Sequence, residues 1–323
     1  MTLLTASLLV LGGLALLAFG GELLVRGATA IAKLAGLTPA VIGLTVVALG
    51  TSLPELVVTI LAAIEGQPDL AVGNVIGSNL ANITFILGLT AVITPLPIVG
   101  GVVRREWPFL FLITVVCLLF VRDGLLSRLE AATFLTTLCL FVGYMVWLSR
   151  REVTAQEAED LSEEVQARAL PVVWRPAVVA VGVTVIGILM LIVGGKLLVD
   201  GAVVLAELAG MTPRVIGLTI VALGTSAPEI ATSIVAALRR HTDMAVANLI
   251  GSNVMNTLGI LGVAGAITPL PFSPELAGTD MLWMLAATIL IFPLMRIGMR
   301  VTRWNGVVLL GFYAAYVWVV VGT

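Results

Sequence analysis

Two glutamates lie inside long apolar stretches, each at the end of the same eight-residue motif. The motif A-L-G-T-S-x-P-E runs from Ala48 to Glu55 and again from Ala222 to Glu229. An ionisable residue is costly inside a membrane, so each glutamate is a candidate functional residue. The proline of each motif lacks the N–H that a regular helix needs, so it should break the helix and loosen carbonyls near Ala48 and Ala222. Irregular backbone at membrane depth is tolerated only where it faces protein or a water-filled cavity.

Hydroxyl and amide groups accompany the glutamates. Each motif carries Thr-Ser before its proline, and a second motif, G-S-N-x-x-N, occupies residues 77–82 and 251–256. The serine and the last asparagine of this second motif are four residues apart and share one helix face. Its glycines, with Asn74 and Asn248, predict close helix packing and interhelical hydrogen bonds. Carboxylate, hydroxyl, amide and carbonyl oxygens suit hard cations such as Ca²⁺ and Na⁺.

Both motifs belong to a duplication with an offset of 174 residues. Residues 36–55 match residues 210–229 at 16 of 20 positions, and residues 74–97 match residues 248–271 at 14 of 24. Ionisable residues at matching positions of two repeats point to a binding site at the repeat interface.

The composition sets the fold class that must position these residues. The chain is 59% hydrophobic and 11% charged, with a mean hydropathy of +1.14, whereas about a quarter of the residues are charged in ordinary soluble proteins. The sequence therefore predicts an all-α membrane protein with ten transmembrane helices, of which helices 2 and 7 are broken. Apolar stretches long enough to cross a bilayer lie near 3–20, 40–63, 70–93, 107–121, 128–148, 175–195, 214–238, 244–267, 279–295 and 304–321.

We expect three parts: a first five-helix repeat at 1–148, an acidic cytoplasmic linker at 149–174 and a second five-helix repeat at 175–323. Lys and Arg in short loops stay cytoplasmic. Of the 17 basic residues this layout puts 13 on one side, and 4 on the other: Arg122, Arg128, Lys196 and Arg214. Both termini are then extracytoplasmic in the inner (plasma) membrane. Because five is odd, the repeats are inverted, an architecture typical of alternating-access transporters.

Two pairs at i,i+4 spacing carry opposite signs in the two repeats. Glu22 precedes Arg26, and at the equivalent positions Lys196 precedes Asp200. We interpret them as ion pairs within a helix, with a gate at the mouth of a cavity as the alternative.

Other polar residues receive structural interpretations. We expect His241 in a solvated loop and Cys117 and Cys139 as small apolar side chains. We interpret Asp69 and Asp243 as N-caps of their helices, with ion recruitment as the alternative.

At these motifs the chain resembles the cation/calcium exchanger superfamily, especially prokaryotic sodium/calcium exchangers. The resemblance covers both repeats and the ten-helix layout. It implies exchange of Ca²⁺ for Na⁺ by alternating access, with helices 1 and 6 sliding against the other helices. It also implies Glu55 and Glu229 as shared central ligands. The flanking ligands that it implies are Thr51, Ser52, Thr225, Ser226, Ser78, Ser252, Asn82 and Asn256, with the carbonyls of Ala48 and Ala222.

The chain departs from the family pattern at one position. Several relatives carry an aspartate where this chain has Asn256, so here the site has two acids instead of three. Two carboxylates balance one Ca²⁺ or two Na⁺, and a further Na⁺ would need neutral oxygens.

Two other functions stay open. A Ca²⁺/H⁺ antiporter of the same fold is the nearest, because a buried glutamate can carry a proton; the hydroxyl-rich flanks favour Na⁺. A cation channel is more remote, since channels usually place ligand rings around a pore axis. We expect no enzymatic activity, cofactor, nucleic acid or protein partner. The expected partners are Ca²⁺, Na⁺ and the lipid bilayer.

Overall fold

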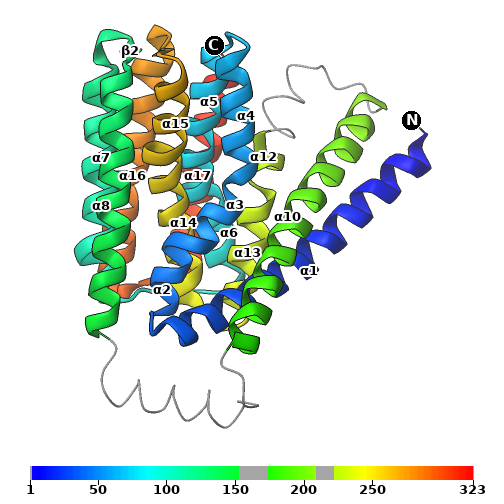
Figure 1. Ribbon diagram of the computed structural model, residues 1–323. Coiled ribbons are helices and arrows are strands. Elements are labelled where there is room, and N and C mark those ends of the chain that lie inside the picture. Colours follow the sequence, from blue (N-terminus) through cyan, green and yellow to red (C-terminus); the bar gives the residue numbers. More distant parts are fainter. Residues whose placement is uncertain (1, 153–173, 209–221, 323) are drawn as a thin grey trace.

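Two long helices form an antiparallel pair that leans away from the rest of the molecule (Figure 1). The structure is a computed structural model, and it describes residues 2–152, 174–208 and 222–322. The pair consists of α1 (Leu3–Ala35) and α10 (Trp174–Leu208). Both run further than the predicted stretches 3–20 and 175–195. Helix α1 ends only at Gly36, whose φ of 62° is left-handed, a conformation in which glycine is favoured.

Glycines let the backbones of α1 and α10 approach closely. A Cβ atom added to Gly13 would lie 2.6 Å from the backbone nitrogen of Leu198, and one added to Gly187 would lie 2.6 Å from that of Leu24. Gly13 and Gly187 are 174 residues apart, so the two repeats contribute equivalent surfaces to this contact. Helix association in membranes depends on such small residues.

The remaining helices form the bundle on the other side of Figure 1. The label η marks short π-helical or 3₁₀-helical segments; η4 and η8 are 3₁₀-helical and the others are π-helical. In the first repeat the elements are α2 (Pro39–Ile42), η1 (Gly43–Val47), α3 (Ala48–Thr51), α4 (Leu53–Ile64), α5 (Pro68–Leu80), η2 (Ala81–Ile86), α6 (Leu87–Ile93), η3 (Val102–Glu106), α7 (Trp107–Phe120), η4 (Val121–Asp123) and α8 (Arg128–Glu152). In the second repeat they are α12 (Ala222–Thr225), α13 (Ala227–Leu238), α14 (Thr242–Val254), η6 (Met255–Ile260), α15 (Leu261–Ile267), η7 (Leu276–Asp280), α16 (Met281–Arg296), η8 (Ile297–Met299) and α17 (Arg303–Gly322).

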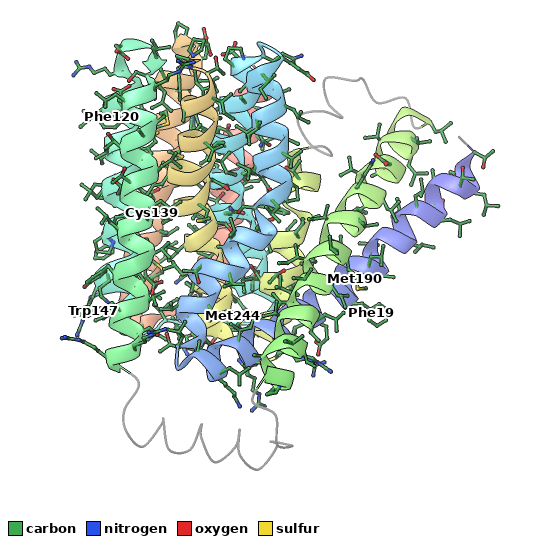
Figure 2. All side chains as sticks on the ribbon, in the orientation of Figure 1. Phe19, Phe120, Cys139, Trp147, Met190 and Met244 are labelled. Carbon is green, nitrogen blue, oxygen red and sulfur yellow. The ribbon has the colours of Figure 1, made fainter. Side chains whose placement is uncertain are left out.

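Helix lengths and hydropathy fit a membrane protein. Within the described residues, seven helices are long and apolar enough to cross a membrane, and the bent pair Pro39–Thr51 and Leu53–Ile64 can form an eighth crossing. Part of the predicted stretch 214–238 lies outside the described residues, which resume at α12. Apolar side chains such as Phe19 and Trp147 project from the outer surface, whereas Met244 lies inside (Figure 2). Cys139 is exposed on that outer surface and Cys117 is buried.

The two repeats interleave in space. Strand β1 (Leu96–Pro97) pairs with β4 (Arg300–Val301), and β2 (Leu125–Leu126) pairs with β3 (Leu270–Pro271). Helix α6 packs against α17, and α15 packs against α8. The last helix of each repeat therefore lies against the third helix of the other repeat.

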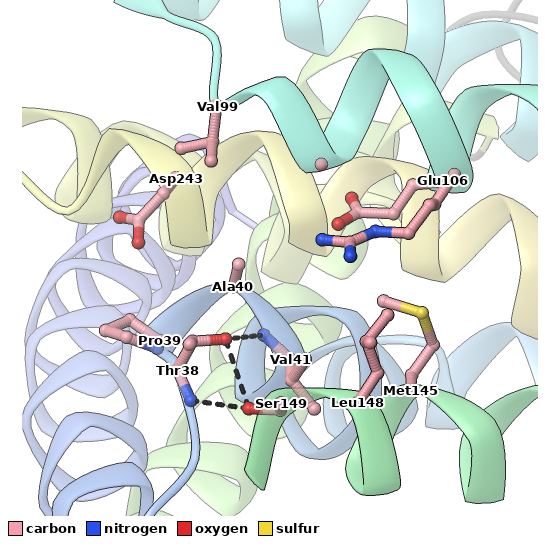
Figure 3. Close-up of a pocket in the computed structure, with 12 residues that line it drawn as sticks. Thr38, Pro39, Ala40, Val41, Val99, Glu106, Met145, Leu148, Ser149 and Asp243 are labelled. Atoms are coloured by element: carbon pink, nitrogen blue, oxygen red, sulfur yellow. Dashed lines mark hydrogen bonds between the residues drawn. The ribbon is translucent and has the colours of Figure 1, made fainter. Parts of the chain in front are cut away.

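The two termini lie at one end of the molecule, and the end of α8 and the start of α10 lie at the opposite end (Figure 1). At the α8 end, a cavity of about 200 Å³ separates the first turn of α14 from α2 and α8 (Figure 3). Ser149 at the end of α8 accepts a hydrogen bond from the backbone N–H of Thr38 at 2.8 Å, which joins α8 to the start of α2.

The N-cap prediction for Asp69 and Asp243 is wrong. The N-cap positions of α5 and α14 belong to Gln67 and His241, neither of which makes a side-chain capping bond. The two aspartates lie instead in the first helical turn, where a negative charge still interacts favourably with the helix dipole. Helix starts are defined by backbone geometry, which the residue type alone specifies only within a position or two.

Candidate cation site

Both glutamate motifs break their helices, and the break falls at the serine. Ser52 has φ −82° and ψ 7°, and Ser226 has φ −87° and ψ 9°, outside the regular helix. Pro54 and Pro228 follow in the first turn of α4 and α13, where a proline's missing N–H costs no hydrogen bond. The segments before and after Ser52 meet at an angle of 47°. The predicted break is therefore present in both repeats.

The two glutamates are buried and hydrogen-bonded across the repeats. Each is 1% exposed. The hydroxyl of Ser226 donates to Oε1 of Glu55 at 3.3 Å, and the hydroxyl of Ser52 donates to Oε1 of Glu229 at 3.2 Å. The serine that precedes one glutamate thus holds the glutamate of the other repeat. This reciprocal arrangement has the two-fold relation expected of a site at a repeat interface.

The helices that carry Asn82 and Asn256 contact the glutamate-bearing helices of the opposite repeat. Helix α4, which carries Glu55, contacts η6, which carries Asn256; helix α13, which carries Glu229, contacts η2, which carries Asn82. Likewise α3 contacts α14, and α12 contacts α5. Each of α4 and α13 therefore contacts the asparagine-bearing helix of the other repeat as well as that of its own, α5 and α14 respectively.

Several buried oxygens of this site have no hydrogen-bond partner among the described residues. Buried polar atoms are normally satisfied, so a group of unsatisfied ones needs an explanation. A bound cation would explain them, because each atom is an oxygen of a kind that binds hard cations. The atoms are Oε2 of Glu55, Oε2 of Glu229, Oδ1 of Asn82, Oγ of Ser252 and Oδ1 of Asn256.

Other predicted ligands occupy the same region with different environments. Ser78 is 4% exposed on α5, and Thr51 is fully buried. Thr225 is partly buried and lines a cavity of about 460 Å³ between α4 and α10.

The prediction of a loosened carbonyl is not matched at Ala48, which accepts hydrogen bonds from the Ser52 N–H at 3.0 Å and the Thr51 hydroxyl at 3.3 Å. Ala222 begins α12, and its side chain lies outside the described residues. The assignment of both carbonyls as ligands stays a prediction.

The two glutamates are the acidic ligands that we assign to this site. Among the described residues, no group of three or more His, Cys, Asp or Glu side chains is placed to hold a metal ion. The donor set is two carboxylates with hydroxyl and amide oxygens, which suits hard cations and offers nothing to soft metals.

A second layer of polar residues supports the glutamate helices. Asn74 donates to the carbonyl of Glu55 at 3.3 Å and to the hydroxyl of Thr59 at 3.0 Å, and Asn248 donates to the hydroxyl of Ser233 at 3.3 Å. These bonds confirm the predicted role of the two asparagines. The receiving hydroxyls were missed, although Thr59 and Ser233 are 174 residues apart and each lies four residues after a glutamate.

Two further features were not predicted. Asn79 donates to the hydroxyl of Thr257 at 2.9 Å, and Asn253 donates to the backbone carbonyl of Asn79 at 3.1 Å, so the first asparagines of the two motifs meet. In addition, Asn82 and Asn256 lie in π-helical turns, which often occur at functional sites.

The predicted close packing of the G-S-N glycines is present at Gly251. A Cβ added there would lie 2.6 Å from the carbonyl oxygen of Leu44 in η1. The residue that corresponds to Leu44 in the second repeat is Leu218, which lies outside the described residues, and no described atom lies within 4 Å of a Cβ added to Gly77.

Known proteins are similar to this chain over nearly its whole length. The family model described as "Sodium/calcium exchanger protein" matches residues 5–147 and 179–322, one match per repeat. The chain is 39% identical to the putative antiporter CaxA of Alkalimonas amylolytica, over 97% of this chain and 98% of that protein. It is 36% identical to the inner membrane protein YrbG of Escherichia coli, over 97% and 96%. It is 30% identical to the sodium/calcium exchanger MaX1 of Methanosarcina acetivorans, over 96% of each.

Solved structures of the sodium-calcium exchanger NCX_Mj superpose on this chain. One of them, soaked with zero Na⁺ and Ca²⁺, gives a TM-score of 0.82 at 28% identity and covers 97% of this chain and 98% of that chain. The predicted fold of ten transmembrane helices in two repeats is thereby confirmed. The chain belongs to the sodium/calcium exchanger family of membrane antiporters and is a transporter, not an enzyme.

Proposed function

We propose that this antiporter exchanges Na⁺ for Ca²⁺ at a site centred on Glu55 and Glu229. The observation that carries the proposal is the group of buried, unpartnered oxygens contributed by both repeats. Two carboxylates neutralise one Ca²⁺, and the amide and hydroxyl oxygens raise the number of ligands toward the six to eight that Ca²⁺ takes. The names of the relatives MaX1 and NCX_Mj, both sodium/calcium exchangers, support the same choice of ions.

Exchange follows from competition for these oxygens. Ca²⁺ and Na⁺ both bind hard oxygen donors, so binding of one lowers the occupancy of the other, and a Na⁺ gradient can drive Ca²⁺ movement. The reciprocal bonds between each serine and the opposite glutamate hold the two carboxylates at one place. The cavity lined by Thr225 is also lined by Pro54 and Pro228, the residues that precede the two glutamates in the chain.

The orientation of the molecule in the membrane is part of the proposal. Both termini lie opposite the end that carries the start of α10 and the end of α8 with Arg150 and Arg151 (Figure 1). Because basic ends stay cytoplasmic, we place the termini and the cavity between α4 and α10 on the extracytoplasmic side. The similarity to an inner membrane protein supports the inner (plasma) membrane as the location.

The test is Ca²⁺ uptake by reconstituted proteoliposomes. Vesicles loaded with Na⁺ and diluted into Na⁺-free buffer should take up Ca²⁺, and vesicles with an imposed pH gradient at equal Na⁺ on both sides should not. Uptake driven by the pH gradient alone would replace this proposal with a Ca²⁺/H⁺ antiporter. Rapid uptake with no counter-ion gradient, at a rate typical of a pore, would indicate a channel.

A further inference from the structure

An ion pair joins α1 to the end of α13, at the edge of a cavity of about 310 Å³. Glu22 of α1 is bonded to Arg26 of its own helix and to Arg239 at the C-terminal end of α13. The Arg239 Nε atom donates to Oε2 of Glu22 at 2.8 Å, and Nη2 lies 2.8 Å from Oε1. Beside this pair, a Cβ added to Gly21 would lie 3.3 Å from a methyl group of Val235. The two helices are therefore in contact here, with the ion pair at the rim.

The other repeat carries the same arrangement with every charge reversed. The offset of 174 relates Glu22 to Lys196, Arg26 to Asp200 and Glu65 to Arg239. An acid on α1 facing a base at the end of α13 therefore corresponds to a base on α10 and an acid at the end of α4.

The turns after α4 and α13 show that this relation is structural as well as sequential. The backbone N–H of Glu65 donates to the carbonyl of Leu61 at 2.9 Å, and that of Arg239 donates to the carbonyl of Val235 at 2.9 Å. The next residues both have left-handed backbones, with φ 72° at Gly66 and 64° at Arg240. Glu65 and Arg239 thus occupy equivalent places at the ends of equivalent helices.

In this structure the second contact is open. The cavity of about 460 Å³ separates Val57 and Val58 of α4 from Lys196 and Asp200 of α10, and both charged side chains are exposed. The nearest atoms to a Cβ built on Gly195, the equivalent of Gly21, belong to Gly224 and Pro228, not to α4. Within the described residues no side chain forms an ion pair with Lys196.

We propose that Lys196 and Glu65 form the ion pair that closes this cavity when the pair of Glu22 and Arg239 separates, so that the two pairs alternate during transport. The inference rests on the proposed alternating-access exchange. Alternating access moves one group of helices against the other around a fixed site. A movement of the pair α1 and α10 that separates α1 from α13 would bring α10 against α4. Partly exposed ion pairs are weak, which suits contacts that form and break in every cycle.

Crosslinking tests the proposed contact without a transport measurement. Glu65→Cys and Lys196→Cys are combined in a chain with Cys117→Ala and Cys139→Ala, and a protease site is inserted within residues 153–173. After oxidation in membranes and proteolysis, a disulfide keeps the two halves together on a non-reducing gel. We expect joined halves for this pair and for the positive control Glu22→Cys with Arg239→Cys.

The matched control pairs Glu65→Cys with Val193→Cys, because Val193 lies on α10 just before Lys196 and is 49% exposed on an apolar surface. Separate halves for Glu65→Cys with Lys196→Cys, under every ion condition in which the positive control joins, would overturn the proposal. Joined halves in the Val193 control would do the same, because they would show that the crosslink is nonspecific.

Charge reversal supplies a second test in the intact transporter. Lys196→Glu should lower Ca²⁺ uptake several-fold, and Lys196→Glu combined with Glu65→Lys should restore it to within about twofold. If Asp200 were the only partner of Lys196, Glu65→Lys would give no rescue and Asp200→Asn would reproduce the loss, and the proposal would fail. Na⁺-driven Ca²⁺ uptake by the native protein is measured separately. If the halves crosslink but the native protein shows no such uptake, the proposed Na⁺/Ca²⁺ exchange is refuted, whereas the proposed contact between Lys196 and Glu65 still stands.

Discussion

Replacing Glu55 or Glu229 with glutamine tests the cation site most directly. The change preserves the size of the side chain and removes one unit of negative charge from a position that is 1% exposed. One oxygen of each glutamate already accepts a serine hydroxyl from the other repeat, and the other oxygen has no partner among the described residues. The substitution therefore removes charge from the unpartnered oxygen that we assign to the ion.

Coulomb's law gives the size of the effect. Two unit charges about 4 Å apart interact by about 4 kcal/mol at an effective dielectric constant of about 20. A carboxylate thus contributes about 8 kcal/mol toward Ca²⁺ and about 4 kcal/mol toward Na⁺. Since about 1.4 kcal/mol is a factor of ten, the difference of about 4 kcal/mol predicts that glutamine disfavours Ca²⁺ relative to Na⁺ by roughly a thousandfold.

The assay is Na⁺-driven Ca²⁺ uptake together with Ca²⁺ and Na⁺ binding to the purified protein. Both glutamine variants should lose Ca²⁺ uptake, and equally, because the site is two-fold. Glu106→Gln is the matched control, since Glu106 is a glutamate of similar burial (3% exposed) that lies by the separate cavity of Figure 3. Near-native uptake in either site variant would refute the assignment. An equal loss of Ca²⁺ and Na⁺ affinity would refute the electrostatic reasoning.

Three further outcomes are expected. A tag at either terminus should be accessible from outside the cell, and a tag within residues 153–173 only from the cytoplasm. Labelling of intact and permeabilised cells measures this accessibility, and termini found in the cytoplasm would reverse the assigned sides of the membrane. Asn256→Asp adds a titratable group to the site, so its uptake at fixed Na⁺ should vary with pH more than that of the native protein; superimposable profiles would remove position 256 from the site. Gly13→Ala should lower the thermal midpoint of the purified protein, because its Cβ would lie 2.6 Å from the backbone of Leu198, an overpacking that costs about 1–3 kcal/mol. Gly12→Ala has no atom within 4 Å of its Cβ and should leave the midpoint unchanged.

The sequence was sufficient for the elements that local chemistry specifies. The prolines after Ser52 and Ser226 predicted a break in both helices, and both breaks are present. The duplicated asparagines Asn74 and Asn248 predicted interhelical hydrogen bonds, which the structure contains. The prediction of a site with two acids, which follows from the asparagine at position 256, stays a prediction. Each of these depends on a residue type at one position, which a single sequence records.

Contacts between the repeats depended on the tertiary structure. Nothing in either motif indicates that Ser52 binds the glutamate of the other copy, that α6 packs on α17, or that Asn82 lies in a π-helical turn. The two copies of each motif are nearly identical, so their sequence has almost no asymmetry with which to choose an open side. The way in which the pair α1 and α10 packs against the other helices makes that choice. It joins Glu22 of α1 to Arg239 and leaves Lys196 of α10 beside a cavity. The alternating-access exchange that we propose requires both arrangements from one sequence, and only a three-dimensional structure shows which of them is present.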